Sequence, residues 1–122
     1  MLNRIKREKR LHPRLPHELP VYIAANGYDF TTTTQNISCT GAYCRINRYV
    51  PPFTKIAIKM SLPSLDCAKY EKSEVECKGV IVRTDDEAKG GFNIAIFFNE
   101  IKGSQKKKIS QYINQLLPQW SA

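Results

Sequence analysis

The chain has 122 residues, of which 42% are hydrophobic and 25% are charged, and its formal net charge at pH 7 is +8. This length and composition favour one globular domain with its own core over a disordered chain or two ordinary domains. No apolar run approaches the roughly 20 residues of a membrane-spanning helix, and no apolar segment follows the basic N-terminus as in a signal peptide, so we expect a cytoplasmic protein.

Residues 1–17 form the first predicted element, a flexible basic arm. Six basic residues and one acidic residue fall within positions 1–14, and Pro13 and Pro16 disfavour a continuous helix. Residues 17–104 contain equal numbers of basic and acidic side chains and are close to neutral. Because the positive charge is concentrated in the arm, we expect a localised anionic partner and no specific binding of nucleic acid.

The pattern of residues 18–46 predicts three β-strands. Apolar and other residues alternate over positions 19–24, and Asn26-Gly27 is a strong signal for a two-residue hairpin turn. Aromatic and β-branched residues make 28–34 the returning strand. A third strand is expected to begin just past Gly41.

Three more strands are predicted further along the chain, over residues 56–62, 75–83 and 92–98. Pro51-Pro52, a polar stretch over 63–73 and the segment 84–91 are expected to be loops. Six short strands without a helix between them favour an all-β fold, an antiparallel barrel that leaves few exposed strand edges. We place this domain at residues 18–122.

The end of the chain changes to a helical period. Apolar residues recur at three- and four-residue steps, which predicts an amphipathic helix over about 104–117, with Ser104 as its N-cap and Pro118 as its stop. The residues that define the apolar face are Ile109, Tyr112, Ile113, Leu116 and Trp120. We expect this face to be buried across the mouth of the barrel.

The residue inventory argues against an enzyme and against a metal site. Both histidines, His12 and His17, stand beside prolines in the predicted arm, where a general base would be poorly held. The cysteines lack the short spacing of a zinc site, and in a cytoplasmic protein we expect reduced thiols, several of them in the core. They are Cys39, Cys44, Cys67 and Cys77. We therefore predict no catalytic residues, no metal and no cofactor.

Two short clusters favour a binding function. Arg10 and Arg14 lie four residues apart in the arm, and each guanidinium can grip a phosphate or the O6/N7 edge of a guanine. Asn36 and Ser38 leave the same face of a strand, and Gly41 lets the backbone pass close to a flat ligand. Together these clusters predict a site for an anionic small molecule that contains purines.

The two clusters resemble the motifs of the PilZ domain family, Arg-x-x-x-Arg followed by Asp/Asn-x-Ser-x-x-Gly. Residues 80–83, the Gly90-Gly91 loop and residues 92–97 also look like the last strands of that family, so the resemblance covers about residues 7–117. It implies a six-stranded barrel with a C-terminal helix that binds the second messenger cyclic di-GMP. The residues expected to bind it are Arg10, Arg14, Asn36, Ser38 and Gly41, with Arg7 and Lys9 in a secondary electrostatic role.

The resemblance also implies a signalling role. Binding would order the arm and pass the signal to an unidentified effector protein, with the receptor acting as a monomer or a dimer. One alternative is an adaptor of the same fold that does not bind the nucleotide. Another is a binder of single-stranded nucleic acid that uses the arm with Tyr22, Tyr28 and Tyr43.

Overall fold

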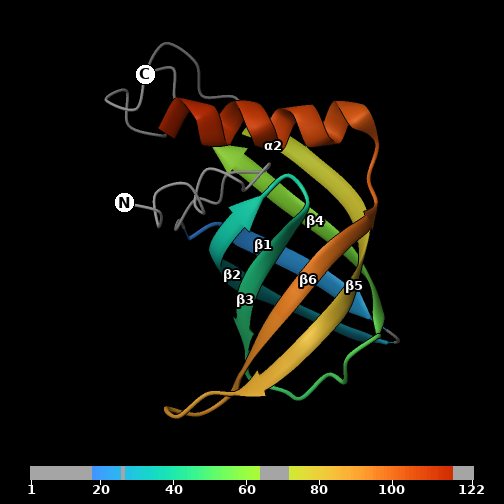
Figure 1. The fold of residues 1–122 in the computed structure, drawn as a ribbon, viewed down its shortest axis with the longest axis vertical. Coiled ribbons are helices and arrows are strands. Elements are labelled where there is room, and N and C mark those ends of the chain that lie inside the picture. The colour runs from blue at the N-terminus through green and yellow to red at the C-terminus, as the bar shows by residue number, and fades with distance from the viewer. Residues whose placement is uncertain (1–17, 26, 64–71, 117–122) are drawn as a thin grey trace, which may run out of the picture.

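The computed structural model describes residues 18–25, 27–63 and 72–116, which form a closed antiparallel β-barrel with one helix across its end (Figure 1). The strand order around the barrel is β1-β2-β3-β6-β5-β4, so β4 pairs with β1 and closes the sheet. The elements are β1 (Pro20–Ala25), β2 (Tyr28–Ser38), β3 (Gly41–Ile46), β4 (Lys55–Pro63), β5 (Lys72–Asp86), β6 (Phe92–Glu100) and α2 (Gly103–Leu116). The six-stranded barrel predicted from the sequence is therefore confirmed.

Some sequence predictions fall on parts of the chain outside the described residues. These predictions concern the arm over residues 1–17, Cys67, Pro118 and Trp120. The division of the chain into an arm and a barrel at residue 18 stays a prediction.

The barrel core follows from the period of two in the strands. In β4 buried and exposed residues alternate strictly from Lys55 to Met60, and in β6 the apolar Ile94, Ile96 and Phe98 are buried. Because successive strand residues point to opposite sides, these side chains line the interior. The turn predicted at Asn26-Gly27 is also confirmed, since Ala25 pairs with Tyr28 and Gly27 has a φ of +85°.

Three cysteines, Cys39, Cys44 and Cys77, are buried and free, as expected for structural thiols. Burial raises the pKa of Cys44 to about 12 and the pKa of Cys77 to about 11, because the interior disfavours the charged thiolate. At neutral pH these two side chains are therefore protonated and behave as small apolar groups.

Several strands extend further than the sequence pattern indicated. β5 covers 72–86 where 75–83 was predicted, because residues at both of its ends find backbone partners in β4 and β6. The loop predicted over 84–91 is correspondingly shorter. These extensions were missed because the end residues are polar or exposed on both faces and show no alternation.

Helix α2 lies across one end of the barrel and packs against β5 and β2 (Figure 1). Its buried side chains are Ile109, Tyr112 and Ile113, which confirms the predicted apolar face. The prediction of Ser104 as the N-cap is wrong. The Lys102 carbonyl accepts hydrogen bonds from the amides of Gln105 and Lys106, at 3.0 and 2.9 Å, so the helix starts at Gly103 and Ser104 lies inside its first turn.

Candidate ligand-binding site

Residues 36–41, here called the motif turn, comprise the end of β2, the two connecting residues Cys39 and Thr40, and Gly41, the first residue of β3. Ser38 and Gly41 form the last pair of these two strands. The Ser38 Oγ accepts a hydrogen bond from the Thr40 amide at 3.2 Å and lies 3.1 Å from the Thr40 hydroxyl. Ser38 is only 1% exposed. Its hydroxyl therefore shapes the turn from within, as serine side chains do in tight turns.

A β-bulge at Gln35 sets the direction in which the motif turn presents its side chains. Thr34 pairs with Cys44 and Asn36 pairs with Tyr43, so β2 uses one more residue than β3. Thr34 before the bulge and Ile37 after it are both 0% exposed. The bulge thus reverses the alternation and places Asn36 on the side of the strand opposite Ile37. Asn36 is half-buried there, beside Tyr43.

Gly41 is required by the approach of a neighbouring strand. A Cβ atom at this position would overlap with the backbone carbonyl oxygen of Ile96 in β6. The amide of Phe98, also in β6, donates to the Thr40 carbonyl at 2.9 Å and draws the turn against this strand. The glycine therefore has a structural function in the pairing of β3 with β6, and its predicted contact with a ligand stays a prediction.

The chain enters the barrel next to the strand that carries the motif turn. The Leu19 amide donates to the Thr34 Oγ1 and the Thr34 amide donates to the Leu19 carbonyl, both at 2.9 Å. Both residues are buried. The start of β1, the motif turn and α2 all lie at the same end of the barrel (Figure 1).

Arg7, Lys9, Arg10 and Arg14 lie outside the described residues, so the structure does not place them against the motif turn. Arg14 is five residues before Leu19, a length of chain that spans at most about 18 Å when extended. Ser38 is four residues beyond Thr34, or about 13 Å along a strand. The length of the chain therefore permits Arg14 to reach the motif turn from its anchor at Thr34.

The Thr34 hydroxyl gives a first testable prediction. Thr34→Val keeps the shape of the side chain but leaves the buried Leu19 amide without its acceptor, so we expect a loss of about 1–2 kcal/mol in the free energy of unfolding. Urea denaturation measures this loss. Thr33→Val, at the neighbouring exposed position, is the control and should leave stability within about 0.5 kcal/mol. Equal stability of both variants would contradict the anchoring role of Thr34.

The outer surface beside the motif turn carries groups that the motif did not predict. The Arg83 guanidinium lies 6.0 Å from the centroid of the Tyr43 ring, and its Nε is 2.8 Å from the Asp85 carboxylate. Phe97 on β6 is 48% exposed and pairs with Gly41. The sequence could have indicated Phe97, because it is an apolar residue at a position that the alternation of its strand predicts to face outward.

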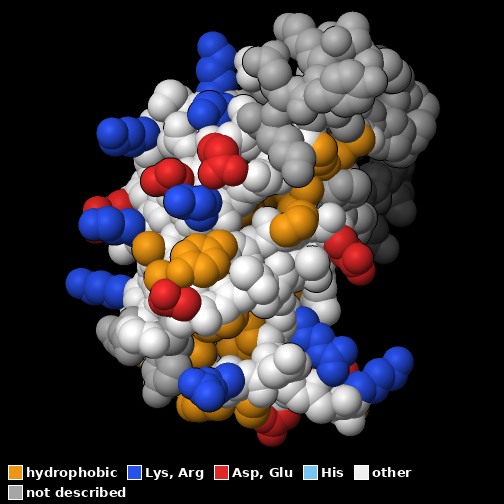
Figure 2. All heavy atoms as spheres, turned by 180° about the vertical axis from the view of Figure 1, so that it is seen from behind, with side chains coloured by type: hydrophobic (Ala, Val, Ile, Leu, Met, Phe, Trp, Pro, Cys, Tyr) orange, Lys and Arg blue, Asp and Glu red, His pale blue; other side chains and the backbone are white. Residues whose placement is uncertain are grey.

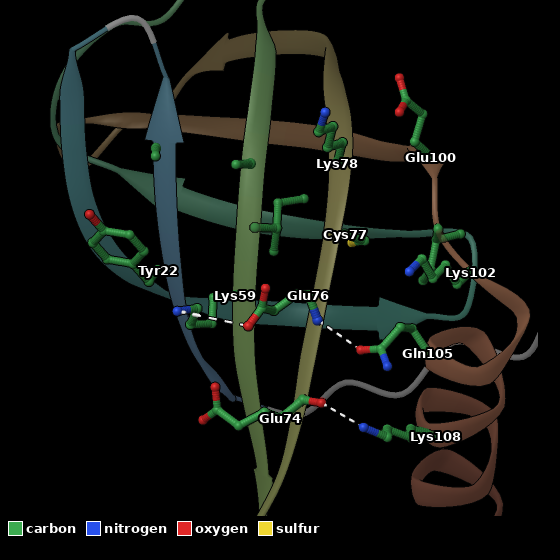
Figure 3. A pocket seen from close by; sticks show the side chains of 14 residues that line it. Tyr22, Lys59, Glu74, Glu76, Cys77, Lys78, Glu100, Lys102, Gln105 and Lys108 are labelled. Carbon is green, nitrogen blue, oxygen red and sulfur yellow. Dashed lines mark hydrogen bonds and ion pairs between the residues drawn. The ribbon is translucent and has the colours of Figure 1, made fainter.

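A separate groove of about 910 Å³ lies between strands β1, β4 and β5 and the start of α2 (Figure 3). The Glu76 amide donates to the Gln105 Oε1 at 2.9 Å, and the Lys108 Nζ donates to the Glu74 carbonyl at 3.0 Å. These contacts fasten α2 to β5. The groove lies on the opposite side of the barrel from the motif turn, and its lysines are offset by the carboxylates of Glu74, Glu76 and Glu100, so it offers no concentrated positive charge to an anionic ligand.

The charge distribution bears on the nucleic-acid alternative. On the face of the molecule turned away from the viewer of Figure 1, Lys and Arg side chains are interspersed with Asp and Glu side chains (Figure 2). Tyr22, one of the aromatic residues that this alternative invoked, lines the groove of mixed charge. The described residues on this face form no continuous basic track of the kind that single-stranded nucleic acid needs.

Within residues 18–25, 27–63 and 72–116, no three His, Cys, Asp or Glu side chains gather as the ligands of a metal ion would. Over the same residues no helix has the length and apolar character needed to cross a membrane.

The family model of the PilZ domain matches residues 8–115 of the chain. This range contains both arginines of the arm and the whole motif turn. No curated protein matches the chain.

Solved structures share the fold at low sequence identity. The structure of the Bacillus subtilis inhibitor of motility, MotI/DgrA, has a TM-score of 0.76 at 18% identity, covering 88% of this chain and 50% of that one. The chain thus spans half the length of that protein. The PilZ domain of CeSA from a cellulose-synthesizing bacterium has a TM-score of 0.61 at 18% identity over 85% and 97% of the two chains. The PilZ domain of YcgR from Escherichia coli, solved with c-di-GMP, has a TM-score of 0.58 at 10% identity over 86% and 88%.

Proposed function

Because this chain belongs to the PilZ domain family, we propose that it is a receptor for cyclic di-GMP that relays the signal to a partner protein. The strongest support for the proposal comes from the two motifs and from the place where the chain enters the barrel. The chain has both motifs of the family complete, and the hydrogen bonds between Leu19 and Thr34 hold Leu19, five residues after Arg14, beside the strand that carries Asn36 and Ser38. The YcgR domain of the same fold, solved with c-di-GMP, supports the choice of ligand.

The chemistry of the ligand matches the residues available. Cyclic di-GMP has two guanines and two phosphates, and so a charge of −2. Arg10 and Arg14 can each make bidentate, charge-assisted hydrogen bonds to a guanine O6/N7 edge or to a phosphate. Asn36 can bond a guanine edge at the barrel surface. Arg7 and Lys9 add electrostatic attraction without a defined contact.

Ser38 and Gly41 support the site mainly by shaping it. The Ser38 hydroxyl is used inside the turn, and Gly41 allows β3 to lie against β6. Together they keep the backbone of residues 39–41 in one conformation, in which Cys39 and Gly41 are buried and Thr40 is half-buried. We propose that a guanine approaches this backbone closely, and that Ser38 orders the polar edge that the guanine meets.

The output is a change in the surface at one end of the barrel. Binding would hold the arm along β2, close to α2. A partner protein would then recognise the surface that the arm and the barrel form together. The function is one of binding and relay, and no step of it requires a catalytic residue.

Isothermal titration of the full chain with cyclic di-GMP tests the proposal, with GTP and cyclic di-AMP as controls. We expect saturable binding of the guanine dinucleotide alone, and the stoichiometry separates one ligand from a stacked pair. The absence of binding would contradict the receptor function and would favour the adaptor of the same fold that acts through protein contacts only.

Ser38→Ala gives a second testable prediction. We expect the affinity for cyclic di-GMP to fall by about threefold to tenfold, because the turn loses a hydrogen bond worth about 1 kcal/mol. Ser61→Ala is the matched control, since Ser61 lies on β4, across the barrel, and bonds the exposed Glu74 carboxylate at 2.7 Å. The same titration measures both variants, and equal affinities would argue against a role for Ser38.

A further inference from the structure

Phe97 occupies an unusual position on the outside of the barrel. Its neighbours in β6, Ile96 and Phe98, are each 4% exposed and face the core, whereas Phe97 is 48% exposed and faces outward. A large apolar side chain in the middle of a solvent-facing strand adds nothing to the core. Packing in the core therefore does not account for the Phe97 side chain, and we consider a function in binding.

The backbone of Phe97 is held directly against the motif turn. Phe97 pairs with Gly41 across the β3–β6 ladder, and a Cβ atom built on Gly41 would lie 3.6 Å from the Phe97 Cα. The hydrogen bond of 2.9 Å between the Phe98 amide and the Thr40 carbonyl fixes this register. Because Gly41 has no side chain, nothing on β3 covers the neighbouring ring from that position. The exposed Phe97 ring therefore lies directly beside the buried Gly41, at the edge of the motif turn.

We propose that the Phe97 ring is a stacking platform for one guanine of cyclic di-GMP, an inference that rests on the proposed function. A purine has a flat π-face and a polar edge, so it can stack on Phe97 while its edge meets the polar groups of the motif turn. Phe97 and the motif turn are neighbours on the sheet, because β2 pairs with β3 and Gly41 of β3 pairs with Phe97 of β6. Phe97 then supplies an apolar side chain to a site whose other proposed side chains, those of Arg10, Arg14, Asn36 and Ser38, are polar or charged.

The test compares variants of Phe97 by titration of the full chain with cyclic di-GMP. Phe97→Ala is expected to weaken binding about tenfold, within the range that base–aromatic stacking supports. Phe97→Leu keeps apolar volume without the flat ring and should also be weakened, whereas Phe97→Tyr should bind like the wild type. Phe53→Ala is the control, because Phe53 is 79% exposed in the loop between β3 and β4, at the other end of the barrel, and should leave affinity unchanged.

The outcomes distinguish this inference from the proposed function. If the wild type binds cyclic di-GMP through Arg10 and Arg14 but Phe97→Ala binds equally well, the stacking role is wrong and the receptor function stands. If the wild type itself does not bind, the proposed function fails, and the inference fails with it. Equal affinity of Phe97→Leu and the wild type would overturn the stacking geometry. Circular dichroism of each variant confirms that the barrel is folded.

Discussion

Replacing Arg10 and Arg14 together by alanine is expected to weaken cyclic di-GMP binding by about a hundredfold or more while the barrel keeps its stability. Each bidentate guanidinium contributes about 1–3 kcal/mol to the recognition of guanine, so the loss of both removes most of the specific contact energy. The strands that the structure describes close the barrel through their own pairs, around a core of described residues, so we expect the loss of the two arginines to cost little stability. Titration calorimetry and thermal unfolding measure the two effects separately.

A control within the arm separates the specific contacts from simple charge. The double variant Arg4→Ala with Lys6→Ala also removes two positive charges, but both lie outside the Arg-x-x-x-Arg motif. It should weaken binding only a few-fold, through reduced electrostatic attraction. Replacement of Arg10 and Arg14 by lysine keeps the charge but loses the planar fork, so most of the affinity should still be lost. Wild-type affinity in the double alanine variant would refute the assignment of the two arginines.

Gly41→Ala is expected to destabilise the protein by about 3 kcal/mol, a cost typical of severe overpacking. The added methyl group would overlap with the Ile96 carbonyl oxygen, and backbone cannot rotate away as a flexible side chain can. To make room for the methyl group, β3 must move away from β6. This movement strains the strand pairing, which continues from Gly41 to Ile46. Urea and thermal denaturation measure the loss.

Gly103→Ala is the matched control for Gly41→Ala. No atom lies within 4 Å of a Cβ atom built on Gly103 at the start of α2, and alanine favours a helix, so this variant should be as stable as the wild type or slightly more stable. If Gly41→Ala unfolds at the same urea concentration as the wild type, the steric role of Gly41 is wrong. A loss of ligand binding in Gly41→Ala can be interpreted only at temperatures where the variant is folded.

The fold could be predicted from the sequence because apolar core residues alternate with other residues along several of the strands. Ile94, Ile96 and Phe98 alternate cleanly, and Asn26-Gly27 marks a hairpin turn by its own conformational preference. The bulge at Gln35 could not be predicted in this way. A run of threonines before it carries no alternation, and only the pairing of β2 with β3 shows where one extra residue is inserted.

The candidate site was predictable as a set of residue types but not as a geometry. The motif named Ser38 and Gly41, yet the local role of each depends on atoms elsewhere, the Thr40 amide and the Ile96 carbonyl. The anchor between Thr34 and Leu19 and the pairing of Phe97 with Gly41 join segments far apart in the chain. Such contacts follow from strand order, which composition and local pattern do not determine.

The most direct test of a cyclic di-GMP site at the motif turn is an NMR titration of the ¹⁵N-labelled full chain with cyclic di-GMP. If cyclic di-GMP binds at the motif turn, large chemical-shift changes are expected for the amides of residues 36–41, Phe97 and Phe98, together with those of Arg10 and Arg14. The amides of Glu76 and Gln105 in the groove across the barrel, and of Phe53 at its other end, should change little. Changes centred on the groove, or no change at a saturating concentration of ligand, would contradict a cyclic di-GMP site at the motif turn.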